Sequence, residues 1–129
     1  MIFGIGQDIC NSKRIEATLN RFGDRFKNRI YTSIEIQKCD SKKNYVDSYA
    51  RRFAAKEAFS KALGTGFKKG VFYKDIEIVN LKSGKPTIIL RGGALNQFKL
   101  LTKNDKSATI DVSLTDDFKL ALAIVIISN

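Results

Sequence analysis

Residues 44–66 read NYVDSYARRFAAKEAFSKALGTG, and this stretch predicts the longest helix of the chain, from about Asn44 to Leu63. One face of that helix carries residues that recur at spacings of three and four, namely Ala50, Phe53, Ala54, Glu57 and Lys61. The glycines of GTG end the helix, since glycine is favoured just beyond a helix C-terminus.

Glu57 is unusual on this face because its neighbours are alanines and a phenylalanine, so we expect it to be partly buried. One interpretation is an i, i+4 ion pair with Lys61, worth a few tenths of a kcal/mol. Asp8 offers a second interpretation, in which two carboxylates form a site. It ends a predicted strand, on the face where Gly4 and Gly6 leave room for another backbone or a ligand. The alternative for Asp8 is that it only caps the following turn.

The chain before this helix predicts a strand and two further helical segments. Ile2 to Ile9 alternates as a strand does. Ile15, Leu19, Phe22 and Phe26 then form a helical stripe that Gly23 is expected to break or bend. Thr32-Ser33-Ile34-Glu35 fits a capping box and predicts the start of the next helix at Thr32.

The chain after residue 66 changes to a period of two. Asp75–Val79 and Thr87–Leu90 flank KSGK at 82–85 and predict a hairpin. A short helix at about 94–101 precedes a second hairpin, 109–115 with 119–128. The last strand is apolar on both faces and should be central or covered. The prediction is one α+β domain over residues 1–129, ordered strand, three helices, hairpin, helix, hairpin.

The composition restricts the possible chemistry. With 23 Lys and Arg against 13 acids the net charge is +10, which favours an anionic partner. The chain contains no histidine, which excludes Ser-His-Asp and Cys-His catalysis. Cys10 and Cys39 show no metal or disulfide spacing. No signal peptide and no segment long enough to span a membrane are present, so we expect a cytoplasmic protein that binds no membrane.

Two carboxylates without histidine suit a hard cation. Mg²⁺ commonly takes one or two carboxylates and completes its octahedron with water and phosphate oxygens. Asp8 and Glu57 are therefore the candidate magnesium ligands.

Basic residues supply two further features. Arg14, Thr18, Arg21 and Arg25 form a stripe on the first helix that is nearly free of acids. Such a face is either simply solvated or suits an acidic helix or phosphates. Lys42, Lys43, Arg51, Arg52, Gly64-Thr65-Gly66 and Gly84-Lys85 are each consistent with a phosphorylated ligand.

Taken together, the segments resemble the holo-acyl-carrier-protein synthase family of 4′-phosphopantetheinyl transferases. The matching pieces appear in the family's order: GIGQDI at 4–9, RFAAKEAFSKALGTG at 52–66, DIEI at 75–78, GKP at 84–86 and VSLT at 112–115. The long second piece is highly specific. The resemblance implies transfer of 4′-phosphopantetheine from coenzyme A to a serine of apo acyl carrier protein, in support of fatty acid biosynthesis, with release of 3′,5′-ADP.

The resemblance also implies residue roles. Asp8 and Glu57 would hold Mg²⁺, and Ser60 and Lys61 would lie beside the transferring phosphate, with Asp8, Glu57 and Lys61 as the catalytic residues. The coenzyme A site would comprise Lys43, Arg52, Ser60, Lys61, Gly64, Gly84, Lys85 and Pro86. Arg14, Arg21 and Arg25 would dock the carrier protein. Family members form homotrimers with coenzyme A between subunits.

One position departs from the family pattern. Asp116 stands where the family usually has a histidine near the nucleotide, so coenzyme A binding could be weaker or the proton acceptor different. The sequence leaves open a metal-bound water or a carboxylate as the base that accepts the serine proton. Two alternative functions are a basic RNA-binding module and a catalytically weakened trimer that still binds carrier protein. The RNA reading lacks RNP, GXXG and RGG motifs, so we expect no nucleic acid partner.

Overall fold

The computed structural model describes residues 1–129, and its elements follow the predicted order. The helices are α1 (Ser12–Phe22), α2 (Asp24–Ile30), α3 (Ser33–Asp40), α4 (Tyr45–Leu63), the short 3-10 helix η1 (Tyr73–Asp75) and α5 (Gly92–Leu101). The strands are β1 (Ile2–Asn11), β2 (Ile76–Asn80), β3 (Pro86–Leu90), β4 (Thr109–Asp117) and β5 (Leu120–Ser128). The predicted α+β class is confirmed.

The local signals that set the helix boundaries act as expected. Gly23 adopts a positive φ of 55° and separates α1 from α2. Thr32 accepts from the backbone N–H of Glu35, and the Glu35 side chain accepts from the backbone N–H of Thr32, which completes the predicted capping box. Gly64 ends α4 in the left-handed region, with φ of 82°.

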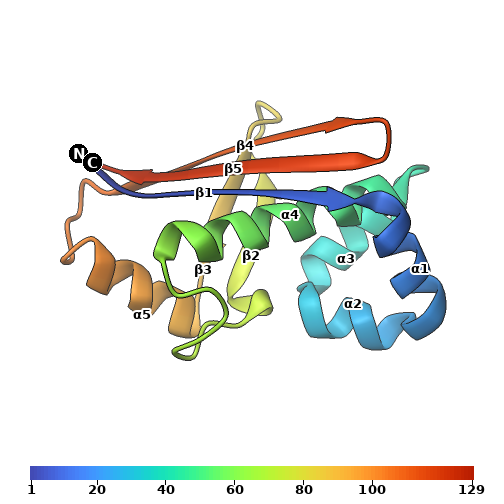
Figure 1. The fold of residues 1–129 in the computed structure, drawn as a ribbon, viewed down its shortest axis with the longest axis horizontal. Helices are drawn as coiled ribbons and strands as arrows, with labels where there is room; N and C mark the ends of the chain where they lie inside the picture. The colour runs from blue at the N-terminus through green and yellow to red at the C-terminus, as the bar shows by residue number, and fades with distance from the viewer.

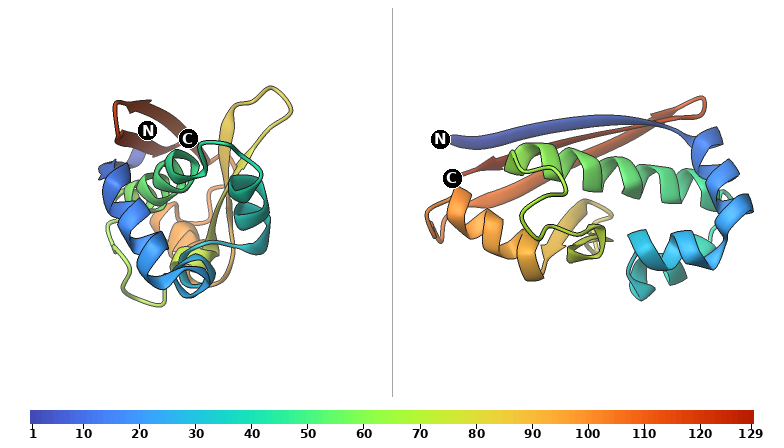
Figure 2. Two further views of the ribbon diagram at one scale, coloured as in Figure 1. Left: turned by 90° about the vertical axis from the view of Figure 1, so that its right-hand side faces the viewer. Right: turned by 60° about the horizontal axis from the view of Figure 1, so that its bottom comes forward.

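The strands form two antiparallel sheets on either side of α4. One sheet has the order β1-β5-β4, so the last strand is central, as its two apolar faces predicted. The other is the β2–β3 hairpin, with Pro86 at the start of β3. The three-stranded sheet runs along α4, with α1–α3 at one end and α5 at the other (Figure 1). The β2–β3 hairpin lies on the opposite side of α4 from β1 (Figure 2).

The inner face of β1 packs directly against the backbone of α4. A Cβ on Gly4 would come within 2.0 Å of the Ala62 carbonyl oxygen, and one on Gly6 within 1.8 Å of that of Ala58. Glycine is required at both positions, since any side chain would collide with helix backbone. Of the two options left open by the sequence, the glycines make room for another backbone, and Asp8 follows them on the same strand.

The outer face of the three-stranded sheet leaves apolar side chains uncovered. Large aliphatic residues of β1 and β5 are between 37% and 58% exposed there: Ile5, Ile9, Leu122 and Ile124. No helix of the chain covers this face (Figure 1). No helix combines the length and apolar character that a membrane crossing requires.

Candidate functional site

Asp8 and Lys61 meet where β1 runs beside the C-terminal half of α4. The Lys61 ammonium donates to the Asp8 carboxylate at 2.9 Å and to the backbone carbonyl of Gln7 at 3.1 Å. The Asp8 side chain is 17% exposed and that of Lys61 54%. This contact depends on the glycine-mediated approach of strand to helix, because Lys61 comes from α4 and Asp8 from β1.

Glu57 lies one turn before Lys61 and bonds to a different residue. The Tyr73 hydroxyl donates to Glu57 Oε1 at 2.6 Å. Lys61 pairs with Asp8 and makes no ion pair with Glu57, so the i, i+4 interpretation is wrong. The turn-capping interpretation of Asp8 is also wrong, because Asn11 caps α1.

The two carboxylates act on the same surroundings. Burial raises the pKa of the Cys10 thiol to about 11, and the charges of Asp8 and Glu57 contribute to the rise. Burial and the hydrogen bond to Glu57 also raise the pKa of Tyr73, with a further contribution from Asp8. Asp8 and Glu57 thus both contribute to the raised pKa of Cys10 and to that of Tyr73.

The donor set at this point fits a hard cation. It offers carboxylate oxygens from Asp8 and Glu57, and the chain has no cluster of three or more histidine, cysteine or acidic side chains that could enclose a metal. Asp8 and Glu57 are carboxylates, the ligand type that Mg²⁺ takes, and the chain lacks the ligand cluster of a structural zinc site.

One cavity adjoins Asp8 and Lys61, and a second adjoins Tyr73. One, of about 520 Å³, is lined by Asp8 and Lys61 together with strand residues, namely Gln7, Ile9, Ser113, Thr115, Leu122, Ala123 and Ile124. The other, of about 410 Å³, lies between Tyr73 and the first two helices and is lined by Thr18, Phe22, Arg25, Phe26, Arg29 and Ile30. Asp8 and Lys61 are therefore accessible from the sheet side, and the second cavity is reached through Tyr73, which binds Glu57.

The predicted coenzyme A residues lie in separate parts of one chain, and two of them are buried. Ser60 is buried and its hydroxyl donates to the Glu57 carbonyl at 2.7 Å. Gly64 caps the C-terminus of α4. Gly84, Lys85 and Pro86 lie at the β2–β3 turn, where Lys85 is 3.5 Å from Asp111. These residues do not line a common cavity with Asp8.

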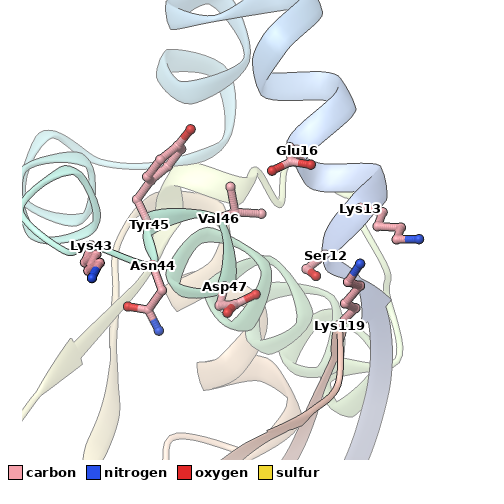
Figure 3. A pocket seen from close by; sticks show the side chains of 9 residues that line it. All are labelled: Ser12, Lys13, Glu16, Lys43, Asn44, Tyr45, Val46, Asp47 and Lys119. Carbon is pink, nitrogen blue, oxygen red and sulfur yellow. The ribbon is translucent and has the colours of Figure 1, made fainter.

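Lys43 lies at a third cavity, of about 530 Å³. In Figure 3 it sits on the loop before α4, across from Lys119 at the β4–β5 turn. Asp47 and Glu16 also line this cavity, so its charge is mixed. Neither Asp8 nor Glu57 contributes to it.

Arg52 is 5% exposed, and its guanidinium donates to the Ser48 hydroxyl at 2.8 Å. Its Nε is buried without a partner. The side chain lines a cavity of about 170 Å³ beside Lys38. Arg52 and Lys38 are the basic residues of this cavity, and the acidic Glu35 lines it as well.

Asp116 forms an ion pair with Arg51, whose guanidinium donates to its carboxylate at 2.7 Å. The pair joins the end of β4 to α4. One of the basic residues predicted to attract phosphate is therefore neutralised by the residue that departs from the family pattern.

The arginines of the basic stripe are exposed and unpaired. Arg14, Arg21 and Arg25 form no ion pair, and neither does Arg29, which continues the stripe on α2. Arg25 and Arg29 line the cavity that Tyr73 closes. Unpaired guanidinium groups around an apolar cavity suit an acidic partner.

Sequence reasoning missed a buried polar network behind Glu57. Lys56 is completely buried and donates to Glu35 at 2.8 Å and to the carbonyl of Tyr73 at 2.9 Å. Glu77, also buried, accepts from the hydroxyl of Thr32 and from Arg91. Nothing in the local sequence distinguishes Lys56 or Tyr73 from surface residues.

Comparisons with known proteins identify the family and support the fold. The sequence profile of the 4′-phosphopantetheinyl transferase superfamily matches residues 4–123. The chain is 52% identical to holo-acyl-carrier-protein synthase of Parvibaculum lavamentivorans over 99% of this chain and 96% of that protein.

Two solved structures share the fold over nearly their full length. The crystal structure of holo-acyl-carrier-protein synthase from Neisseria meningitidis aligns over 100% of both chains, with a TM-score of 0.87 and 36% identity. The enzyme of Helicobacter pylori, solved in complex with coenzyme A, covers 96% of this chain and 99% of its own, with a TM-score of 0.79 and 30% identity. The chain belongs to the holo-acyl-carrier-protein synthase family of 4′-phosphopantetheinyl transferases.

Proposed function

We propose that this protein transfers the 4′-phosphopantetheine group of coenzyme A to a serine hydroxyl of apo acyl carrier protein and releases 3′,5′-ADP. The carrier would then serve fatty acid biosynthesis. The observation that carries the proposal is the ion pair between Lys61 and Asp8 beside a cavity, one helical turn from Glu57, in a chain of this family. The named relatives are holo-acyl-carrier-protein synthases, and one is solved with coenzyme A.

The reaction requires that the serine oxygen bond to the β-phosphorus as the bond to the 3′,5′-ADP oxygen breaks. Asp8 and Glu57 would hold Mg²⁺, which when bound neutralises phosphoryl charge and orients the diphosphate. Lys61 would stabilise the charge that develops on the leaving group. The hydrogen bond that Lys61 donates to Asp8 keeps its ammonium close to the carboxylate that would hold Mg²⁺, and so close to the diphosphate.

Coenzyme A binding would combine Lys61, Ser60 and the Gly64 cap at the diphosphate with Lys43, Arg52 and residues 84–86 at the 3′-phosphate end. One chain does not bring these groups into one cavity, which supports a site shared between subunits. The exposed apolar face of β1 and β5 supports assembly into a homotrimer, since uncovered patches of this kind mark interfaces. Light scattering tests the assembly, and Ile124→Glu should reduce both the measured mass and the activity.

The exposed arginine stripe would dock the acidic carrier protein. Arg14→Glu or Arg21→Glu should raise the KM for carrier protein and leave the affinity for coenzyme A nearly unchanged. Lys99→Glu, an equal charge change on exposed α5, serves as the control. An equal fall in coenzyme A affinity would show that the arginines do not act as a docking surface.

The transfer itself is tested by mass spectrometry of apo carrier protein after incubation with the enzyme, coenzyme A and Mg²⁺. We expect the carrier to gain one phosphopantetheine, and we expect EDTA or Glu57→Ala to abolish the gain without unfolding the protein. Asp105→Asn removes a carboxylate charge on the turn after α5 that lines none of the cavities described, and this variant should remain active. No mass gain with the unaltered enzyme under any metal condition would refute the proposal.

A further inference from the structure

Tyr73 holds the side chain of Glu57 from a segment that is distant in the sequence. Its hydroxyl donates to Glu57 Oε1 at 2.6 Å. This is the length of a charge-assisted O–H···O⁻ bond, which is about twice as strong as a neutral one. The bond occupies one oxygen of the carboxylate and leaves the other free.

The tyrosine is itself fixed by contacts on its ring and on its backbone. The ring stacks on Phe67 with centroids 3.7 Å apart and on Phe53 with centroids 5.7 Å apart. Its backbone carbonyl accepts a hydrogen bond from the buried ammonium of Lys56 at 2.9 Å. Two successive residues of α4, Lys56 and Glu57, therefore bind Tyr73 at its carbonyl and at its hydroxyl.

Lys56 is in turn held by an acceptor from another helix. Glu35 accepts from Lys56 at 2.8 Å, and both side chains have no exposed surface. The other oxygen of Glu35 accepts from the backbone N–H of Ile78 on β2. The contacts behind Glu57 thus run through α3, α4, β2 and η1, so Tyr73 has little freedom to move away.

We propose that Tyr73 is a positioning residue that orients the Glu57 carboxylate for the metal, by occupying one oxygen so that the other faces Asp8 and the bound diphosphate. This inference rests on the proposed function. A rigid partner is needed because a carboxylate with free rotation would spend part of its time in orientations that bind no metal. Loss of a residue that hydrogen-bonds a metal ligand typically lowers metal affinity or activity by about 10- to 100-fold.

Tyr73→Phe tests the proposal because it removes the hydroxyl and keeps the ring that stacks on Phe67 and Phe53. Calorimetric titration of Mg²⁺ into protein saturated with coenzyme A should give a Kd raised about tenfold or more. Excess Mg²⁺ should restore much of the lost transfer rate. The affinity for coenzyme A in EDTA should not change.

Tyr31→Phe is the matched control. Tyr31 is buried, and its hydroxyl donates to the Tyr49 carbonyl at 2.9 Å rather than to Asp8 or Glu57. Removing this hydroxyl should lower the midpoint of unfolding and leave the Mg²⁺ affinity unchanged. If Tyr73→Phe binds Mg²⁺ within twofold of the unaltered protein, or if its rate is not restored by Mg²⁺, the positioning role is refuted.

A second measurement uses the unaltered protein, so its result does not depend on whether a variant folds. The chain has four tyrosines, so ring-labelled tyrosine gives few Cζ resonances in an NMR spectrum. Mg²⁺ added to the coenzyme A complex should shift the Tyr73 resonance and leave that of Tyr31 in place. No shift at saturation would contradict the proposal. Failure of the unaltered protein both to bind Mg²⁺ and to transfer the group would instead overturn the proposed function, and this inference with it.

Discussion

Gly6→Ala tests the close approach of β1 to α4, on which the meeting of Asp8 with Lys61 depends. The added Cβ would lie 1.8 Å from the Ala58 carbonyl oxygen and 2.6 Å from the Ala62 nitrogen. The first distance is 1.6 Å short of the 3.4 Å at which ordinary contact begins. Both obstacles are backbone atoms, so no rotamer change can remove the collision.

Two effects of the substitution oppose each other. Alanine restricts the unfolded chain more than glycine does. In a strand interior this effect alone would raise the free energy of unfolding by about 0.5–1 kcal/mol. Overpacking typically costs about 1–3 kcal/mol, and more where backbone must shift. The second effect dominates at this position. We expect the free energy of unfolding to fall by about 3 kcal/mol.

The consequence for activity follows from the same displacement. If β1 moves away from α4 by about the missing distance, Asp8 moves relative to Glu57 and Lys61. Misplacement of a catalytic group by about 1 Å can cost about 100-fold in rate. Transfer to apo carrier protein, measured per folded molecule, should therefore fall by about two orders of magnitude.

Urea unfolding followed by circular dichroism measures the stability, with Gly66→Ala as the control. A Cβ on Gly66 would have no atom within 4 Å, so alanine causes no collision there. Only the positive φ of 58° disfavours alanine, and the free energy of unfolding should fall by about 1–2 kcal/mol. The reasoning is refuted if Gly6→Ala unfolds at the same urea concentration as the unaltered protein and transfers at the same rate.

Three further outcomes are expected. Lys56→Met leaves the buried Glu35 without its cation and should lower the free energy of unfolding by about 3–5 kcal/mol. Denaturant unfolding measures this change, and a change below about 1 kcal/mol would contradict the burial of the pair. Lys61→Met frees Asp8 and should tighten Mg²⁺ binding in the absence of coenzyme A while lowering kcat, and weaker Mg²⁺ binding in calorimetry would argue against competition for that carboxylate. Asp116→Ala removes a negative charge and should lower the KM for coenzyme A by about fivefold, since the repulsion between one charge and a nearby phosphate in water is about 1 kcal/mol. An unchanged KM would mean that Asp116 does not face the nucleotide.

The features that sequence predicted are those with local causes. Gly23 breaks the helical stripe because of its own backbone conformation, and Thr32 begins α3 through a side chain three residues from its partner. The central place of β5 followed from its two apolar faces. Asp8 and Glu57 became candidate site residues through their positions among glycines and alanines.

The missed features have partners from distant segments. Lys61 was paired with Glu57 in one interpretation because the two are neighbours on a helix, but the folded strand brings Asp8 close enough to bind it instead. Tyr73 is 16 residues from Glu57, and Lys56 is 21 residues from Glu35. No periodicity links such pairs, so the sequence alone predicts that Lys56 and Tyr73 are exposed to solvent.

The small side chains of α4 connect the fold to the site. Ala54, Ala58 and Ala62 are buried, and the last two present their backbone to the glycines of β1. Because neither element has bulk at the contact, their backbones lie close enough for Asp8 to reach Lys61 across them. The network around Lys56 holds the opposite side of the helix through polar contacts, which fix direction more tightly than apolar packing does. The helix is thus closely packed on one side and hydrogen-bonded on the other, and Glu57 lies between the two. A carboxylate in that position has its orientation set by the core, so mutations far from any cavity should alter metal affinity before they alter the fold.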